Sequence, residues 1–292
     1  MVAPPPVTIG LPVYNAEKYV AQALDSLIDQ TYGDFNVIIS DNASTDRTPE
    51  ICNEYARRDK RILYSRNAVN IGASPNFNRV FALSESPFFK WATADDYWAP
   101  TMLEKCLNVV TSDPTVALCY PQATLVDADG SNPRPYDDAL HLVQDSPRER
   151  FTTLMEKIRL SHQHQGVARS SMLKRTLMLG VHVGSDINLL AELVLYGKFY
   201  EYAERLFFRR FHQDSGSWAR NSDEHQARRY YAASAPRMAY VGWRQHYSFF
   251  RAVTRAPLTL RDRFALYRYL GRRLRWDRER LARELWTKSG GR

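Results

Sequence analysis

The stretch Phe88-Phe89-Lys90-Trp91-Ala92-Thr93-Ala94-Asp95-Asp96-Tyr97-Trp98 decides how the rest of the chain is interpreted. Its apolar first half is typical of a buried strand, and the run ends abruptly in two adjacent carboxylates. Neighbouring acids at a buried strand end repel each other and lose water, so they cost stability unless something positive lies on them. Carboxylates at the carboxyl end of an α/β strand suit Mg²⁺ or Mn²⁺. A solvated turn with an Asp helix cap is the alternative interpretation.

The segments around this stretch alternate between strand and helix patterns. Apolar runs predict strands at 7–12, 35–40, 61–65, 88–94 and 116–120. Amphipathic or capped segments predict helices up to about 28, up to about 58, at 75–84 and from 100 onward. This alternation predicts an α/β fold with a mostly parallel, doubly wound, Rossmann-like sheet flanked by helices. Beyond residue 121 the pattern loosens, with a helix at 185–196, a strand at 199–211 and a helical extension beyond 221.

Composition and charge limit the class of protein. The 292 residues have the composition of a soluble globular protein, and no apolar run is long enough to cross a bilayer. The first residues carry no signal-peptide pattern, and the three cysteines have no metal-ligand spacing, so we expect a cytoplasmic protein with reduced thiols. Of the formal net charge of +8, residues 251–292 contribute +9 and the rest about −1. The main domain therefore does not require a nucleic-acid partner, and none is expected.

Six short motifs follow one another along the chain. They are Leu11-Pro12-Val13-Tyr14-Asn15, Ser40-Asp41-Asn42-Ala43-Ser44-Thr45-Asp46, Asn70-Ile71-Gly72, Ala94-Asp95-Asp96, Gly184-Ser185-Asp186 and Phe208-Arg209-Arg210-Phe211-His212-Gln213-Asp214-Ser215. In this order they resemble the motifs of the family-2 glycosyltransferases, which have the GT-A nucleotide-sugar-binding fold. The match covers roughly residues 7–220, and the tail lies outside it. Two departures stand out: the acidic motif holds two acids rather than three, and Ser185 stands where many relatives have Glu.

The resemblance implies roles for individual residues. Asp186 matches the general base, and Asp96 and His212 match the site for a divalent cation (Mn²⁺ or Mg²⁺). The residues that match nucleotide-binding positions are Pro12, Tyr14, Asn15, Asp41, Asn70 and Asp95. Purely structural roles remain open for three of these residues. Asp41 and Asp186 suit helix caps, and a lone His after a strand, such as His212, is usually structural. His162 and His164 lie in the segment that shapes acceptor sites in the family.

The implied activity is transfer of a sugar from a nucleotide-diphosphate donor, expected to carry uridine, to a hydroxyl of a glycan or lipid-linked acceptor. Transfer would proceed with inversion and metal assistance, as in polysaccharide biosynthesis. We expect residues 1–120 to form the nucleotide-sugar half, 121–220 the acceptor half of the same domain, and 221–292 a basic helical extension. The alternative is a catalytically inactive nucleotide-sugar or glycan-binding module. A dinucleotide-dependent oxidoreductase is disfavoured, because no Gly-x-Gly-x-x-Gly follows the first strand.

The basic tail allows two interpretations. Leu260, Phe264, Tyr267 and Leu274 fall close to helical spacing with Arg between them, and Thr259 suits a helix cap. The first interpretation is a set of helices packed on the catalytic domain with solvated Arg. The second is an interfacial helix on the inner face of an anionic membrane, or a contact in a homo-oligomer.

Overall fold

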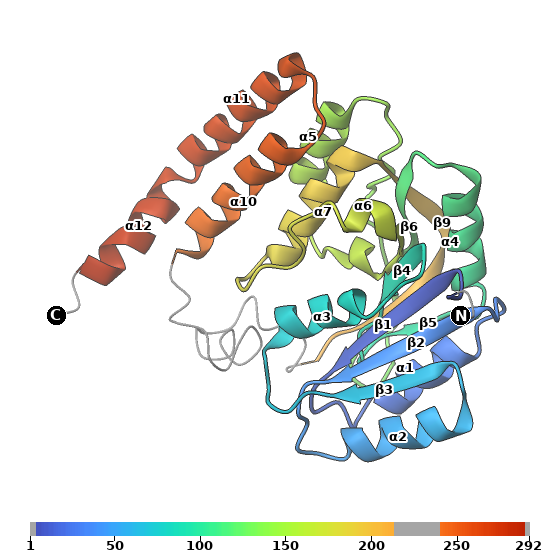
Figure 1. Cartoon of the computed structure of the whole chain (residues 1–292). Helices are drawn as coiled ribbons and strands as arrows, with labels where there is room; N and C mark the ends of the chain where they lie inside the picture. Colours follow the sequence, from blue (N-terminus) through green and yellow to red (C-terminus); the bar gives the residue numbers. More distant parts are fainter. Residues whose placement is uncertain (1–3, 213–239, 290–292) are drawn as a thin grey trace.

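The structure, a computed structural model, describes residues 4–212 and 240–289 and places one nine-stranded sheet between helices (Figure 1). Strands β1 (Val7–Val13), β2 (Phe35–Asp41), β3 (Ile62–Arg66) and β4 (Phe88–Trp91) lie in the order β3-β2-β1-β4. All three pairings in this half are parallel. The predicted α/β class and the mostly parallel sheet are confirmed.

The second half of the sheet adds antiparallel strands to a long parallel pair. β6 (Val116–Val126) runs parallel to β9 (Lys198–Arg210), while the short β8 (Val167–Arg169) lies antiparallel between β4 and β6. β5 (Tyr97–Trp98) and β7 (Arg134–Tyr136) are antiparallel to β9 and β6. Two predicted boundaries were wrong: β4 ends at Trp91, before the acids, and β6 continues six residues past Tyr120.

Two apolar cores cover the two faces of the sheet, because successive strand residues point to opposite sides. Val37 and Ile39 belong to the core on one face, and Ile38 and Phe89 belong to the core on the other. The helices of these layers are α1 (Val20–Ile28), α2 (Thr48–Arg58), α3 (Ala73–Ala82), α4 (Met102–Ser112), α5 (Pro147–Lys157), α6 (Ser170–Leu173) and α7 (Ser185–Tyr196), with the 3-10 turn η1 (His162–Gln165).

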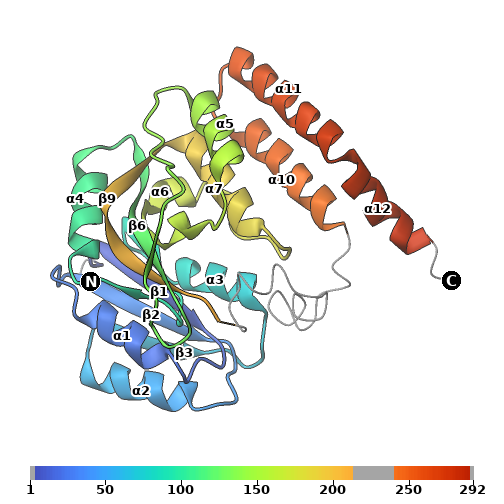
Figure 2. The ribbon, with the colours of Figure 1, turned by 180° about the vertical axis from the view of Figure 1, so that it is seen from behind.

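The described part of the C-terminal extension, residues 240–289, is helical, as predicted, and lies along one side of the domain (Figures 1 and 2). It consists of α10 (Val241–Arg255), α11 (Leu260–Trp276) and α12 (Arg278–Ser289). The Thr259 hydroxyl accepts a hydrogen bond from the Asp262 N–H at 3.1 Å and so caps α11. Within the described residues, no helix is long and apolar enough to span a membrane.

Candidate active site

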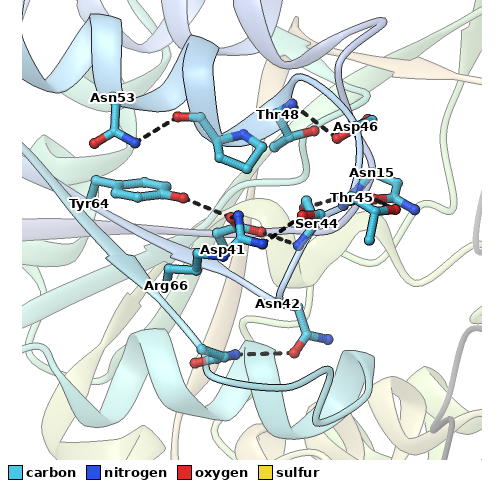
Figure 3. A network of polar contacts seen from close by, with 12 residues as sticks. Asn15, Asp41, Asn42, Ser44, Thr45, Asp46, Thr48, Asn53, Tyr64 and Arg66 are labelled. Carbon is cyan, nitrogen blue, oxygen red and sulfur yellow. Dashed lines mark hydrogen bonds and ion pairs between the residues drawn. The ribbon is translucent and has the colours of Figure 1, made fainter.

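The loops that follow β1 and β2 are joined by side-chain hydrogen bonds at the carboxyl end of the sheet (Figure 3). Asn15, with φ +47°, accepts a hydrogen bond from the Thr45 N–H at 2.8 Å, and its own N–H donates to the Ser44 hydroxyl. Asp46 accepts hydrogen bonds from the Thr48 and Glu17 N–H groups. These bonds fix the two loops beside each other.

Asp41 ends β2 and is completely buried, and three groups of the protein donate to its carboxylate (Figure 3). Oδ1 accepts from the Ser44 N–H at 2.9 Å, and Oδ2 accepts from the Tyr64 hydroxyl at 2.7 Å and the Arg66 guanidinium at 3.1 Å. Burial, and next the hydrogen bond to Asp41, raises the pKa of Tyr64 to about 12, so the phenol remains a donor. The Ser44 bond lies within the loop and does not cap a helix as predicted, because α2 begins only at Thr48, after Arg47. Any nucleotide base would share this carboxylate with Tyr64 and Arg66.

Asn70 belongs to a network of amide side chains beside Asp41. Its Oδ1 accepts from the Asn42 amide at 2.8 Å and from the Gly72 N–H, which precedes α3. Asn42 is buried, and its Oδ1 accepts from the Ile71 N–H at 2.9 Å and from Asn67. Asn70 therefore holds the loop between β3 and α3 against the end of β2. Of the other residues expected at the nucleotide, Pro12 is buried within β1 and Tyr14 is 46% exposed.

The structure brings Asp95, Asp96 and His212 together from two distant segments. His212 Nε2 lies 3.0 Å from Asp95 Oδ2, and the His212 ring packs on Tyr19 with 4.9 Å between ring centroids. Asp96 is buried, with Oδ1 accepting from the Arg210 N–H at 2.8 Å and Oδ2 accepting from the Thr93 hydroxyl. Burial, followed by the Asp95 charge, raises the pKa of Asp96 to about 7, although Arg209, Thr93 and the Arg210 N–H act in the opposite direction.

These groups fit a divalent cation in donor type, because carboxylate and imidazole ligands suit Mn²⁺. Their arrangement fits less closely: among residues 4–212 and 240–289, no three His, Cys, Asp or Glu side chains are grouped to hold a metal ion. Both carboxylate oxygens of Asp96 accept hydrogen bonds from the protein. The carboxylate of Asp95 is partly exposed, and in the described contacts it meets only the His212 imidazole. Asp95 and His212 are therefore the better placed ligands, with Asp96 behind them.

Arg210 fixes the acidic segment, a role that the sequence did not reveal. Its guanidinium donates to the carbonyl oxygens of Asp95 and Ala128, both at 2.9 Å, and to the Gln22 side chain. It also lies over the Tyr19 ring, 4.6 Å from the centroid. The only sequence signal was its place in the Arg-Arg pair before His212.

Asp186 lies in the first turn of α7 and is half-buried. Its Oδ2 accepts a hydrogen bond from the Ser161 hydroxyl, and Ser161 is a buried residue with φ +52°. The adjoining Leu160 carbonyl accepts from the Arg209 guanidinium at 2.6 Å. Arg209 directly precedes Arg210, whose N–H donates to Asp96. A short series of contacts therefore connects the predicted base with the predicted metal site.

His162 and His164 lie in η1, next to Ser161. His162 is buried among Tyr120, Tyr136 and Phe207, and burial is the main cause that lowers its pKa to about 3. His164 Nδ1 contacts the Ser161 carbonyl oxygen at 2.5 Å. His162 is thus a neutral core residue, and an acceptor contact for it has no support in this arrangement. Gln213, Asp214 and Ser215 of the last motif lie outside the described residues.

Comparison with known proteins identifies the family of the chain. The model of glycosyl transferase family 2 matches residues 8–177, more than half of the chain, and the chain therefore belongs to this family. The resemblance carried by the six motifs is confirmed.

Curated relatives match only part of the chain. A glycosyltransferase of Methanocaldococcus jannaschii is 29% identical over 129 residues, which are 44% of this chain and 44% of that protein. The chondroitin synthase of Pasteurella multocida is 31% identical over 127 residues, which are 44% of this chain and 13% of the synthase. The chain thus matches less than half of the length of either relative.

Solved structures share the fold over nearly the whole chain at low identity. Residues 1–349 of TarS from S. aureus, solved with UDP, give a TM-score of 0.67 at 15% identity, covering 92% of this chain and 71% of that one. A mannosyltransferase from Pyrobaculum calidifontis, solved with GDP-Man and Mn²⁺, gives a TM-score of 0.54 at 15% identity, covering 97% of this chain and 85% of that one. This likeness confirms the GT-A fold.

Proposed function

We propose that the protein transfers a sugar from a uridine-diphosphate donor to a hydroxyl of a glycan or lipid-linked acceptor, with inversion and with the help of a divalent cation. The observation that carries this proposal is a series of contacts between the acidic pair and Asp186. His212 contacts Asp95, and the Arg210 N–H donates to the neighbouring Asp96. Arg209, next to Arg210, donates to the Leu160 carbonyl, and Ser161, next to Leu160, donates to Asp186. This series joins an acidic donor-side cluster to a single carboxylate on the acceptor side.

Donor binding would use the ends of β1 and β2. Asp41 offers an anionic acceptor for an N–H of the base, and hydrogen bonds to a sheltered carboxylate are strong. The uracil ring presents such an N–H, as the thymine and guanine rings do, so the choice of uridine depends on the likeness to TarS. Asp95, Asp96 and His212 would hold the cation, and a bound cation offsets the charge that grows on the leaving diphosphate. TarS, solved with UDP and with UDP-GlcNAc, supports a uridine donor by analogy of fold.

On the acceptor side, Asp186 would take the proton of the attacking hydroxyl. A general base must lie within hydrogen-bond reach of that proton. The Ser161 hydroxyl holds one carboxylate oxygen, and the N-terminal end of α7 favours the ionised form. Attack from this side, opposite the leaving diphosphate, produces inversion.

The test is a donor screen on the full chain. UDP-, GDP- and TDP-sugars are incubated with the protein and Mn²⁺, and free nucleotide diphosphate is measured with and without EDTA. We expect slow, Mn²⁺-dependent hydrolysis of a UDP-sugar, accelerated by the correct acceptor. Binding of UDP-sugars without any turnover, across glycan and lipid-linked acceptors, would favour the inactive binding module.

A further inference from the structure

Helices α11 and α12 form one elongated arm at the edge of the molecule (Figure 1). Only Asp277 separates them, and the Asp277 N–H donates to the Arg273 carbonyl while the Leu281 N–H donates to the Asp277 carbonyl, so helical bonding continues across the junction. At about 1.5 Å per residue the arm is roughly 45 Å long. Figure 2 shows α10 between this arm and α7.

The inner face of the arm is apolar and also holds most of its acids. Leu266, Leu270 and Leu281 are buried. The carboxylate of Asp277 meets His246 Nε2 at 2.9 Å, and that of Glu284 accepts from the Gly242 N–H. The packed-helix interpretation of the tail therefore holds for this face, and the negative charge there is turned toward the domain.

The outer face combines arginine with large apolar side chains. Arg261, Arg268 and Arg275 are exposed and follow at intervals of seven residues, so they form one stripe along α11. Beside this stripe Leu260 is 70% exposed and Phe264 is 66% exposed. The exposed arginines of the arm are Arg261, Arg268, Arg272, Arg275, Arg278, Arg280 and Arg283.

Farther along the arm two tryptophans are among the most exposed apolar side chains of the described residues, with Trp276 90% and Trp286 79% exposed. Between residues 260 and 286, where the exposure of every side chain is described, Glu279 is the one exposed acid, and the other three acids are half-buried. Exposed aromatic side chains and exposed arginines, with one exposed acid among them, thus occupy one continuous surface.

We propose that this outer face, defined by Leu260, Arg261, Phe264, Arg268, Arg275 and Trp286, docks the protein onto an anionic lipid surface. Arginine side chains near an anionic bilayer gain electrostatic attraction, while Trp, Phe and Leu side chains insert at the level of the head groups. The face is independent of the transfer chemistry proposed above, because none of its residues belongs to the candidate active site.

The charge pattern favours a lipid surface over a second copy of the chain. A two-fold contact would place the arginine stripe against itself, since both partners of such an interface present the same patch. A nucleic-acid backbone would meet the arginines as well. It would leave Leu260 and Phe264 without an apolar partner.

The test measures co-sedimentation of the full chain with vesicles, without donor or acceptor. One set of vesicles is phosphatidylcholine alone, and the other contains phosphatidylglycerol. The charge variant is Arg261→Gln with Arg268→Gln and Arg275→Gln, and the apolar variant is Phe264→Ser with Trp286→Ser. The matched control, Arg57→Gln with Arg58→Gln and Lys60→Gln, removes the same charge from the exposed end of α2. Far-UV circular dichroism confirms that each variant is folded.

We expect binding to the anionic vesicles only, weakened by salt, and about tenfold or more weaker in the charge variant. The apolar variant should also lose binding, whereas the control should bind like the wild type. Equal loss in the control, or no vesicle binding at all, would overturn the proposal. Salt-dependent binding to duplex DNA alone, or dimerisation that depends on Phe264 and Trp286 without vesicle binding, would overturn it in favour of those partners.

Discussion

His212 Nε2 lies 3.0 Å from Oδ2 of Asp95, a residue 117 positions earlier in the chain. The two side chains meet because β9 pairs with β5, which begins directly after Asp96. In addition, the Arg210 N–H donates to the Asp96 carboxylate, and the Arg210 guanidinium donates to the Asp95 backbone carbonyl. The geometry therefore separates the two adjacent acids: Asp95 faces the imidazole, whereas Asp96 holds the backbone.

This separation predicts different effects for the two amide substitutions. Asp95→Asn should weaken Mn²⁺-dependent UDP binding by at least about tenfold, because an amide is a neutral ligand, yet change the melting temperature little. Asp96→Asn should weaken the same binding and also lower the free energy of unfolding by about 1 kcal/mol, since the neutral amide oxygen accepts a weaker hydrogen bond from the Arg210 N–H and the amide nitrogen must donate to the Thr93 hydroxyl. Calorimetric UDP titration with Mn²⁺ and with EDTA, beside urea unfolding, measures both effects. An Asp95→Asn variant that binds UDP normally with Mn²⁺ would remove Asp95 from the metal site.

A second prediction concerns Asp41, whose buried carboxylate accepts from Ser44, Tyr64 and Arg66. Asp41→Asn should lower the free energy of unfolding by about 2–3 kcal/mol, because the amide nitrogen then faces a donor and Arg66 loses its partner. Tyr64→Phe is the matched control and should cost only about 1 kcal/mol. If Asp41 also accepts from a base, Asp41→Asn should weaken UDP binding, whereas Tyr64→Phe leaves that acceptor in place. Urea unfolding and UDP titration of the two variants would decide this, and equal UDP affinity in both would restrict Asp41 to its structural role.

The first half of the fold could be predicted because β1, β2 and β3 follow one another in parallel with helices between them, which continuous apolar runs reveal. The short strands β5 and β8 could not be predicted. They contain two and three residues and owe their strand conformation to partners far away in the chain. The site shows the same division.

Motif order located Asp95, Asp96, Asp186 and His212, but it could not reveal how they are held. The contacts of Arg210 with residues 22, 95 and 128 depend on tertiary structure alone. Glu192 lies six residues after Asp186 on the same helix. It is buried, and its carboxylate accepts a hydrogen bond from the Leu177 N–H at 2.7 Å and forms an ion pair with Arg255. Its role is therefore structural.

A third prediction concerns Lys90, which is buried in β4 with Nζ donating to the Trp91 carbonyl at 2.9 Å and lying 3.7 Å from the Trp98 ring centroid. Burial lowers the pKa of Lys90 well below its usual value, and the opposing effects of Cys106 and Asp96 are smaller. Between the folded pKa and the unfolded pKa of about 10.4, the unfolded chain holds a proton that the folded chain lacks. Raising the pH in that window therefore stabilises the fold.

Lys90→Met should remove this dependence. The stability of the wild type relative to the variant should rise with pH below about pH 10.4, by at most about 1.4 kcal/mol per pH unit, the value for one proton. Urea unfolding at several pH values measures it, with the exposed Lys60→Met as control. Parallel stability curves for the wild type and Lys90→Met would show that the buried amine keeps its proton.

The last prediction is that Asp186 is the general base and that Ser161 positions it. Asp186→Asn should preserve the fold and UDP affinity, because the base would contact the acceptor hydroxyl and not the diphosphate. Turnover should fall by roughly a hundredfold to ten-thousandfold. If Asp186 merely begins α7, the rate should hardly change, since Asn serves a helix N-terminus nearly as well as Asp.

Ser161→Ala removes the hydroxyl that donates to the Asp186 carboxylate. It should lower turnover by a smaller factor and leave UDP affinity unchanged, because the carboxylate then lacks the hydroxyl that orients it. Steady-state transfer rates of the wild type and the two variants measure these effects, and UDP titration is the control for folding and donor binding. Transfer by Asp186→Asn at the wild-type rate would place the base on another residue.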